Sequence, residues 1–350
     1  MNNATKESVS FSTAVRLGII ATQANTVPMF WGPPGVGKTG GIAPAIADAL
    51  GFKSNMNIIE IAHGDDAEIV GIRIIKDGKV MDAPLTQLRN VIEKPGLLVL
   101  DELNRSLPRQ GLILPLLSQR RLGSWSLHND SRIVCAGNYT TSAGAEPLIS
   151  ALANRLVHIN VLPTLKEVQD YLLSLGKDGD ALALAAEDYA LTAERRPALI
   201  QLEPPPGAED DGVTWASPRA VEGAVRLIAE ADLLGSKSRV EPDELMALLT
   251  GVLGEVTATA YIAVRNLRKQ LPSPKEIAAS PAKVAVPSTP DLEVALLGIL
   301  PQALSMDRGS WAYIARLSPE IRAVARRLWM TRYPGDTTAS RKAMTEAVRV

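Results

Sequence analysis

The chain is organised around Gly32-Pro33-Pro34-Gly35-Val36-Gly37-Lys38-Thr39, a stretch that fits the phosphate-loop pattern G-x-x-x-x-G-K-[ST]. Glycines let the backbone turn so that successive N–H groups point at an anion. Lys38 places a positive charge between the β- and γ-phosphates of a nucleotide, and the Thr39 hydroxyl is a ligand for Mg²⁺. We therefore predict a site for ATP and Mg²⁺ over this loop and the following Gly40.

The residues on either side of the loop have the pattern of an α/β fold. An apolar run over Val27–Trp31 predicts a strand before the loop, and Gly40–Leu50 predicts a helix after it. Bound phosphates would then lie at a helix N-terminus, where backbone N–H groups favour anions. A chance glycine-rich turn is the alternative, and the agreement between motif and flanks argues against it.

A second motif, Asp101-Glu102, directly follows the apolar run Leu97–Leu100. The pattern predicts a buried parallel strand whose carboxyl end carries two acids, at the edge of the sheet where ligands bind in α/β folds. Asp101 would hold Mg²⁺ through water, and Glu102 would act as general base on the attacking water. The alternative is an ordinary strand that ends in a solvated acidic turn.

Further strands and turns complete the predicted core. Arg132–Ala136 predicts a strand that ends at Gly137-Asn138, where the Asn138 amide would sense the γ-phosphate and position water; a strand-capping amide is the alternative. Pro147–Arg155 predicts a helix and Leu156–Val161 a strand, so Arg155 lies at their junction.

Two hairpins are predicted within this core. The first has Asp77-Gly78 between the short β-like runs 72–76 and 79–82, which is a strong hairpin signal. It is either a plain surface hairpin or a contact with substrate. A turn over Arg120–Trp125 predicts the second hairpin.

From Pro163 onward the pattern predicts helices, with Ser217 as an N-cap and Pro218 at a first helical position. The expected ranges are 164–175, 180–191, 218–234, 242–270 with a break near 251–254, 291–304, 309–317, 319–333 and 336–350. Residues 271–290 contain five prolines and predict an extended connector. The expected domains are an α/β nucleotide-binding core (1–162), a helical lid (163–270), the connector (271–290) and a helical C-terminal extension (291–350).

Composition bounds the class of protein. The 350 residues are 46% hydrophobic and 21% charged, with a net charge of −1, so no global charge attracts nucleic acid or anionic lipid. Cys135 is the only cysteine, and no apolar run approaches the roughly 20 residues that span a bilayer. The N-terminus lacks the apolar stretch of a signal peptide, so we expect a cytoplasmic protein that does not insert into membranes. We expect structural roles for His63, His128 and His158.

The order of these motifs resembles the AAA+ ATPases and, within them, the MoxR-like branch with its hairpin inserted in helix 2. Asp101-Glu102-Leu103-Asn104-Arg105 is close to that branch's D-E-I-N-R, and Ala216-Ser217-Pro218-Arg219-Ala220 matches its A-S-P-R-A. The resemblance covers about Phe11 to Leu234. The chain departs from the family at Tyr139, where a proline is common, and at Leu103, which replaces isoleucine.

The resemblance implies a role for each matching residue. Lys38 and Thr39 match Walker A, Asp101 and Glu102 match Walker B, and Asn138 matches sensor 1. Arg219 matches sensor 2, which reaches the γ-phosphate, although a first-turn surface arginine is the alternative. Arg155 matches the arginine finger that acts on the ATP of a neighbouring subunit. An intrachain salt bridge is the alternative for Arg155, and another arginine could face the neighbour instead: Arg105, Arg120 or Arg121.

The expected function is that of a Mg²⁺-dependent ATPase ring, a homo-oligomer that we predict to be a hexamer. MoxR-like proteins remodel or activate a protein client, often with a von Willebrand A-domain partner, so the resemblance implies such a partner here. The alternatives are a nucleic-acid-associated motor, which near-neutral charge disfavours without excluding, and a scaffold that ATP holds together.

Overall fold

The computed structural model describes residues 7–62, 66–139, 142, 144–177, 180–195, 199–208, 212–234, 240–287, 289–297 and 299–332. The chain divides into two compact units. The first comprises Met1–Tyr171 with Ile200–Ala224, and the second comprises Leu172–Leu199 with Val225–Val350. Among the described residues, no helix combines the length and apolarity needed to cross a bilayer.

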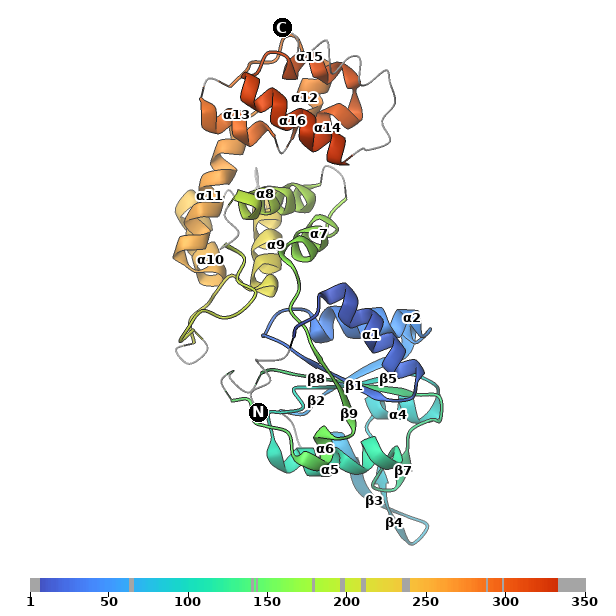
Figure 1. Cartoon of the computed structure of the whole chain (residues 1–350). Coiled ribbons are helices and arrows are strands. Elements are labelled where there is room, and N and C mark those ends of the chain that lie inside the picture. Colours follow the sequence, from blue (N-terminus) through green and yellow to red (C-terminus); the bar gives the residue numbers. More distant parts are fainter. Residues whose placement is uncertain are drawn as a thin grey trace. The chain divides into compact units, whose positions relative to one another are not determined.

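A five-stranded parallel sheet forms the centre of the first unit (Figure 1). Its strand order is β2-β5-β8-β1-β9, with bounds β1 (Val27–Trp31), β2 (Met56–Glu60), β5 (Leu97–Asp101), β8 (Arg132–Gly137) and β9 (Leu156–Asn160). Every neighbouring pair is parallel, so all carboxyl ends meet at one edge of the sheet. Because β8 lies between β1 and β5, the residue after β8 stands between the phosphate loop and the two acids.

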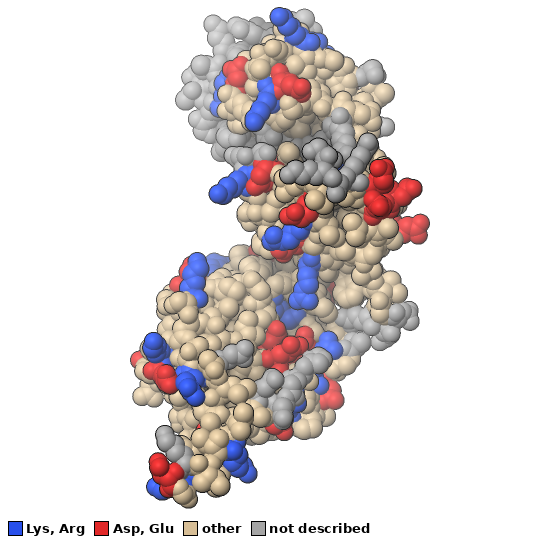
Figure 2. Space-filling model, turned by 180° about the vertical axis from the view of Figure 1, so that it is seen from behind, with Lys and Arg blue, Asp and Glu red and all other residues tan. Residues whose placement is uncertain are grey.

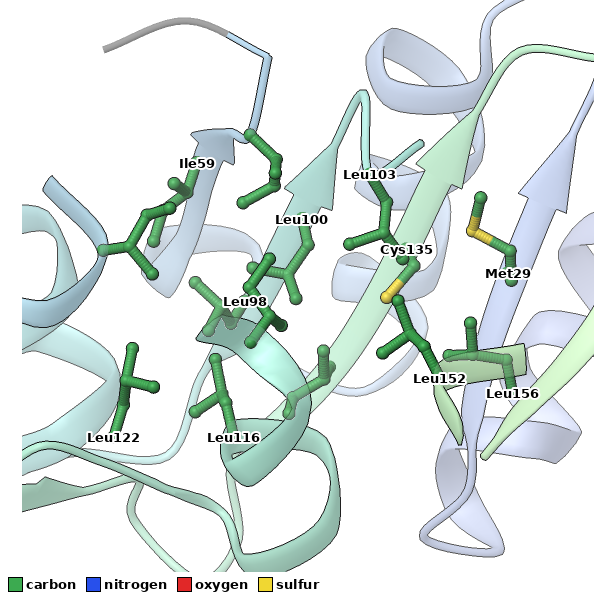
Figure 3. Close-up of a cluster of buried hydrophobic side chains, with 14 of the residues drawn as sticks. Met29, Ile59, Leu98, Leu100, Leu103, Leu116, Leu122, Cys135, Leu152 and Leu156 are labelled. Carbon is green, nitrogen blue, oxygen red and sulfur yellow. The ribbon is translucent and has the colours of Figure 1, made fainter. Parts of the chain in front are cut away.

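Helices cover both faces of this sheet and bury two apolar clusters (Figure 1). One face packs against α1 (Phe11–Gln23) and α2 (Ala43–Ala49), through residues such as Ala14 and Ile46. The other face packs against α4 (Thr86–Glu93), α5 (Leu107–Gln119) and α6 (Ser150–Ala153). Figure 3 shows this second cluster, in which Leu98, Leu100 and Cys135 of the strands lie among leucines of the helices. Burial of both faces accounts for the continuous apolar strands.

The α/β phosphate-loop architecture with a helical C-terminal part is confirmed. The strand before the loop has the predicted bounds. The helical segment after the loop begins at Lys38 instead of the predicted Gly40, and its first turn is not α-helical. A π-helical turn, η2 (Lys38–Ile42), precedes α2, because the N–H groups of Gly41 and Ile42 both donate to the carbonyl of Gly37.

Both predicted hairpins form. In the first, α3 (Asp66–Val70) leads into β3 (Ile72–Lys76), which pairs antiparallel with β4 (Lys79–Ala83). Asp77 and Gly78 have φ of 52° and 73°, the left-handed pair that a two-residue hairpin turn requires. The second pairs β6 (Arg121–Leu122) with β7 (Trp125–Ser126). Before β2 lies the 3₁₀ turn η3 (Lys53–Asn55). His63, for which we expect a structural role, lies outside the described residues.

Most helices beyond β9 agree with the predicted ranges, and the break near 251–254 is confirmed at Gly254, whose φ is 78°. Their bounds are α7 (Leu165–Leu173), α8 (Ala181–Arg195), α9 (Pro218–Leu234), α10 (Pro242–Leu253), α11 (Glu255–Lys269), α12 (Pro274–Ala279), α13 (Pro290–Leu296), α14 (Leu300–Met306), η5 (Arg308–Ser310), α15 (Trp311–Ile314) and α16 (Pro319–Arg332). The single helix predicted over 291–304 is instead two shorter helices, and the range 309–317 contains a 3₁₀ turn and a one-turn helix. The predicted terminal helix 336–350 lies outside the described residues.

The prediction of an extended connector over 271–290 is wrong in part, because α12 forms within it. Ser273 and Glu276 make a capping box at its start, and Pro274 occupies a first helical position, where a missing N–H costs nothing. Ile277 of this helix is fully buried in a cluster with Trp311 and Trp329. The prolines here therefore begin a short helix that belongs to a packed core.

Candidate nucleotide-binding site

The backbone of the loop after β1 has the shape of an anion cradle. Gly35 and Gly37 have φ of 78° and 88°. These values lie in the left-handed region, which residues other than glycine adopt only at a cost in free energy. The N–H groups of Gly35, Val36 and Gly37 have no hydrogen-bond partner among the residues that the structure describes. Unpaired N–H groups in a turn of this kind suit phosphate oxygens.

Lys38 brings its ammonium group inside this cradle. The residue is only 8% exposed, and its Nζ donates to the carbonyls of Gly32 and Pro33, each at 2.8 Å. A third bond, of 2.9 Å, reaches Oδ1 of Asn138. A buried ammonium needs such acceptors, and these three hold it close to where the loop N–H groups converge.

Asn138 connects the loop to the acidic pair. Its Nδ2 lies 3.3 Å from both Oε1 and Oε2 of Glu102, while its Oδ1 accepts from Lys38. The residue is 2% exposed, and its bonds to Lys38 and Glu102 set the orientation of the amide. Lys38, Asn138 and Glu102, which the sequence places far apart, therefore form one hydrogen-bonded cluster at the carboxyl edge of the sheet.

Glu102 has a strained backbone and a carboxylate held from two sides. Its φ is 53°, left-handed for a residue that is not glycine, and such strain is concentrated at functional sites. Its N–H donates to Oδ1 of Asp101 at 2.9 Å, and its Oε2 pairs with Nε of Arg105 at 2.7 Å. The Glu102 side chain remains 25% exposed, so water can reach the carboxylate.

The side-chain oxygen atoms that could bind a metal ion at this site suit Mg²⁺. The Thr39 hydroxyl and the Asp101 carboxylate are half-buried, the first at the start of η2 and the second at the end of β5. Mg²⁺ commonly binds one or two protein oxygens and completes its shell with phosphate oxygens and water. One hydroxyl, one carboxylate and an adjoining phosphate cradle are such a set.

The start of α9 lies against the loop. A Cβ on Gly35 would lie 3.1 Å from Oγ of Ser217 and 3.2 Å from Cβ of Arg219. Ser217 caps the helix as predicted, since its Oγ accepts from the N–H of Ala220 at 3.2 Å. Arg219 is exposed and extends from the first turn beside the cradle. The structure thus brings the base of Arg219 to the loop.

Arg155 is not part of the cluster. It is exposed after α6, and its Nη1 donates to the carbonyl of Ala151 in the same segment. Within the described chain it forms no ion pair. Arg105 is engaged by Glu102, and Arg120 donates to the carbonyls of His128 and Ser131. Burial and the nearby Arg132 both lower the pKa of Arg120.

Several residues that support the site were missed by the sequence analysis. Asn104, quoted there only as part of a motif, is fully buried, and its Nδ2 donates to the carbonyl of Asn138 at 2.9 Å. The Phe11 ring lies against the loop, because a Cβ on Gly37 would lie 3.2 Å from its Cε2. Glu167 accepts the N–H of Phe11 at 3.0 Å. For Asn104, the sequence offered one signal, an amide just past the two acids. No local pattern in the sequence marks Phe11 or Glu167 as part of the site.

His158 links the end of β1 to α6. Its Nδ1 accepts from Nε1 of Trp31 at 2.9 Å, so the ring proton sits on Nε2, 2.9 Å from the carbonyl of Ala153. The Trp31 and His158 rings are stacked. His128 accepts the N–H of Asp130 through Nδ1. Both arrangements agree with structural roles.

Comparison with known proteins finds only weak similarity to solved structures. No protein-family model matches it, and no curated protein matches it at a significant level. NtrX from Brucella abortus is 18% identical over 75% of this chain and 62% of its own, with a TM-score of 0.40. A putative ATPase from Cytophaga hutchinsonii is 15% identical over 76% and 91%, with a TM-score of 0.35.

A RuvB mutant from Thermotoga maritima is 15% identical over 85% of this chain and 82% of its own, with a TM-score of 0.35. This chain therefore spans less than two thirds of NtrX and most of the other two. Likenesses of this size carry no argument about function, which has to come from the site itself.

Proposed function

We propose that the chain binds ATP with Mg²⁺ at loop 32–40 and hydrolyses it to ADP and phosphate. The observation that carries the proposal is the position of Asn138, hydrogen-bonded to Lys38 on one side and to Glu102 on the other. An amide between a phosphate-binding lysine and a carboxylate is placed to orient a water molecule between the γ-phosphate and the base.

Each residue of the cluster has a defined task in this proposal. The N–H groups of the loop and Lys38 would hold the phosphates, and Thr39 and Asp101 would hold Mg²⁺. Bound Mg²⁺ supplies positive charge that offsets the charge developing on the phosphate oxygens. Glu102 accepts a proton from the attacking water, and its partial exposure keeps that water supplied.

We further propose that the protein works as a homo-oligomeric ring, a hexamer, in which Arg155 reaches the ATP of the neighbouring copy. Its exposure, and its lack of an ion pair within the described chain, support a role outside its own subunit. Arg219, next to the loop, would contact the γ-phosphate in its own copy. The domain boundaries at residues 162, 270 and 290 remain part of this proposal.

As the client we propose a protein, which the ring remodels or activates in the manner of MoxR-like chaperones, together with a von Willebrand A-domain partner. The β3–β4 hairpin favours a protein client over nucleic acid, because it exposes large apolar side chains: Ile75 is 79% and Val80 is 65% exposed. Arg73 is paired with Asp82. Basic and acidic side chains are intermixed on the face in Figure 2, whereas a nucleic-acid footprint is a basic stripe.

Two variants test the ATPase proposal. Lys38→Ala should abolish binding of a fluorescent ATP analogue, and Glu102→Gln should retain binding while turnover falls by about 10²–10⁴-fold. Glu102→Gln that hydrolyses ATP at the wild-type rate would overturn the role of the cluster. Turnover stimulated by DNA and not by unfolded protein would favour the motor. A client function that survives in Glu102→Gln would favour the scaffold.

A further inference from the structure

Asn104 is a fully buried amide directly beneath the proposed catalytic cluster, in the turn that follows β5. Its Oδ1 accepts the N–H of Asn138 at 3.2 Å. Its Nδ2 donates to the carbonyl of Asn138 at 2.9 Å and to that of Glu146 at 3.2 Å. One side chain thus joins the end of β8 to a segment that lies further along the chain.

On the β8 side the connection is rigid. Asn104 bonds both the N–H and the carbonyl of Asn138, so the backbone of the sensing residue is fixed relative to Glu102 and Arg105 in the same turn. The end of β8 packs tightly against the Asn104 side chain, since a Cβ on Gly137 would lie 2.5 Å from its Oδ1. A displacement of Asn138 must therefore move Asn104 or break buried hydrogen bonds, which is costly.

On the other side, Asn104 holds the extended segment 144–149 that leads into α6. The carbonyl of Asn104 also accepts the N–H of Glu146 at 2.8 Å. A second buried amide, Gln110 of α5, accepts the N–H of Ile149 at 2.8 Å and donates to the carbonyl of Pro147 at 3.3 Å. The carbonyl of Ile149 then accepts the first N–H groups of α6, and Arg155 follows shortly after this helix ends at Ala153.

These contacts also explain why α6 is shorter than predicted. The helix was expected over Pro147–Arg155 but begins at Ser150, because the three residues before it are held extended by Gln110. The two amides have different contacts. Asn104 bonds both Asn138 and segment 144–149, whereas Gln110 connects this segment to α5.

We propose that Asn104 is a positioning residue that transmits the placement of Asn138 to segment 144–149 and so to Arg155. The inference rests on the proposed function, because Asn138 must respond to the phosphates for there to be a signal. The state of the nucleotide in one copy would then set the position of the arginine that this copy offers to its neighbour.

Hydrogen–deuterium exchange with and without the non-hydrolysable analogue AMP-PNP, at saturation for each variant, tests this coupling. In the wild type, AMP-PNP should slow exchange in peptides covering 32–40 and change it in peptides covering 144–155. In Asn104→Asp, which keeps the acceptor and loses both donors, the first effect should persist. The second should fall to about a fifth or less, because an Asp oxygen faces two carbonyls without a proton to share.

Kinetics provide a second readout. For Asn104→Asp and Asn104→Ala, kcat should fall by about 10-fold or more while KM changes by less than about 3-fold, since the phosphates are still held and only the geometry is lost. The matched control is Gln110→Met, similar in size. Its segment 144–155 should exchange faster in both states but still respond to AMP-PNP.

The outcomes separate the two proposals. If AMP-PNP fails to protect 32–40 in the wild type, the proposed function fails. If 32–40 is protected but 144–155 does not respond, or responds equally in Asn104→Asp, the coupling alone is overturned. An equal loss of response in Gln110→Met overturns the assignment to Asn104. Should Asn104→Ala not fold, as judged by circular dichroism, the isosteric Asn104→Asp decides.

Discussion

Nζ of Lys38 lies 2.9 Å from Oδ1 of Asn138, so a single hydrogen bond joins the phosphate loop to the end of β8. The bond exists because β8 is inserted between β1 and β5 in the sheet. It also determines which way the Asn138 amide faces, since an oxygen turned to Lys38 leaves the NH₂ group for Glu102.

The orientation of Asn138 leads to the first prediction. Asn138→Ala should lower kcat by about 10²–10³-fold, the usual effect of removing one oriented donor, with little change in the Kd for ATP. Asn138→Asp should also weaken ATP binding by about 10-fold, because a carboxylate competes with phosphate for Lys38. Steady-state turnover and fluorescence titration measure the two effects. An Asn138→Ala enzyme of normal kcat would exclude the proposed role.

The second prediction concerns Gly37, whose φ is 88° and whose Cα faces the Phe11 ring. Gly37→Ala forces an alanine into the left-handed region, which costs about 1–2 kcal/mol, and should weaken ATP binding by distorting the cradle. Gly111→Ala on α5 is the control: a Cβ there meets nothing within 4 Å, so helix propensity alone should raise the Tm. Equal Tm shifts in both variants would contradict this account.

Local patterns in the sequence predicted the elements that build the site. The loop, the strand before it, the acids after Leu100 and the amide after Gly137 each have a signal within about ten residues. Their convergence follows from parallel pairing, because parallel strands end at one edge. Such features can be predicted from the sequence since each depends on neighbouring residues and on one general rule of sheets.

Features that depend on distant partners could not be predicted in this way. Nothing near Asn104 indicates that it will meet Glu146, because that contact exists only once the sheet is assembled. The error over 271–290 has the same origin. Five prolines suggested an extended chain, but burial of Ile277 against Trp311 and Trp329 determines the structure there. Tertiary packing outweighed local propensity.

The third prediction tests the shared site. Arg155→Ala should lower turnover by about 10³-fold or more, the typical contribution of an arginine supplied in trans. Mixing Arg155→Ala with Glu102→Gln should restore part of the activity, because each copy supplies what its neighbour lacks. Arg121→Ala removes an exposed arginine of β6 that is an alternative trans arginine, and it should leave turnover unchanged if Arg155 has this role. No recovery in the mixture, with assembly verified by mass photometry, would place Arg155 outside the neighbour's site.

The fourth prediction concerns the hairpin tip, where Ile75 and Val80 are directly paired across β3 and β4. Replacing both with threonine keeps the β-branched shape that strands favour and removes apolar surface. Basal turnover should remain unchanged, while stimulation by a permanently unfolded protein such as reduced, carboxymethylated lactalbumin should be lost. Ile20→Thr, at an isoleucine of α1 that is 62% exposed, should retain the stimulation. Stimulation that persists in the hairpin variant would mean that the client binds elsewhere.

The fifth prediction concerns Glu167, which ties the start of α1 to the start of α7. Partial burial raises the pKa of Glu167, but N–H groups of Ser12, Thr164 and Phe11 donate to its carboxylate and lower that pKa to about 2. Because the folded pKa lies below the unfolded value of about 4.3, the carboxylate stabilises the fold above pH 4.3. This contribution is lost as the pH falls toward 2.

Glu167→Gln should therefore lower the free energy of unfolding at pH 7 by about 1 kcal/mol, a typical helix-cap effect for a carboxylate largely screened by solvent. The difference from wild type should shrink as urea melts are repeated from pH 5 toward pH 3. Since Glu167 holds Phe11 and the Phe11 ring lies on the phosphate loop, ATP affinity should fall as well. Asp170→Asn, which breaks only an exposed pair with Lys166, should change neither quantity measurably. A Glu167→Gln effect that is independent of pH would mean that its charge does not stabilise the fold.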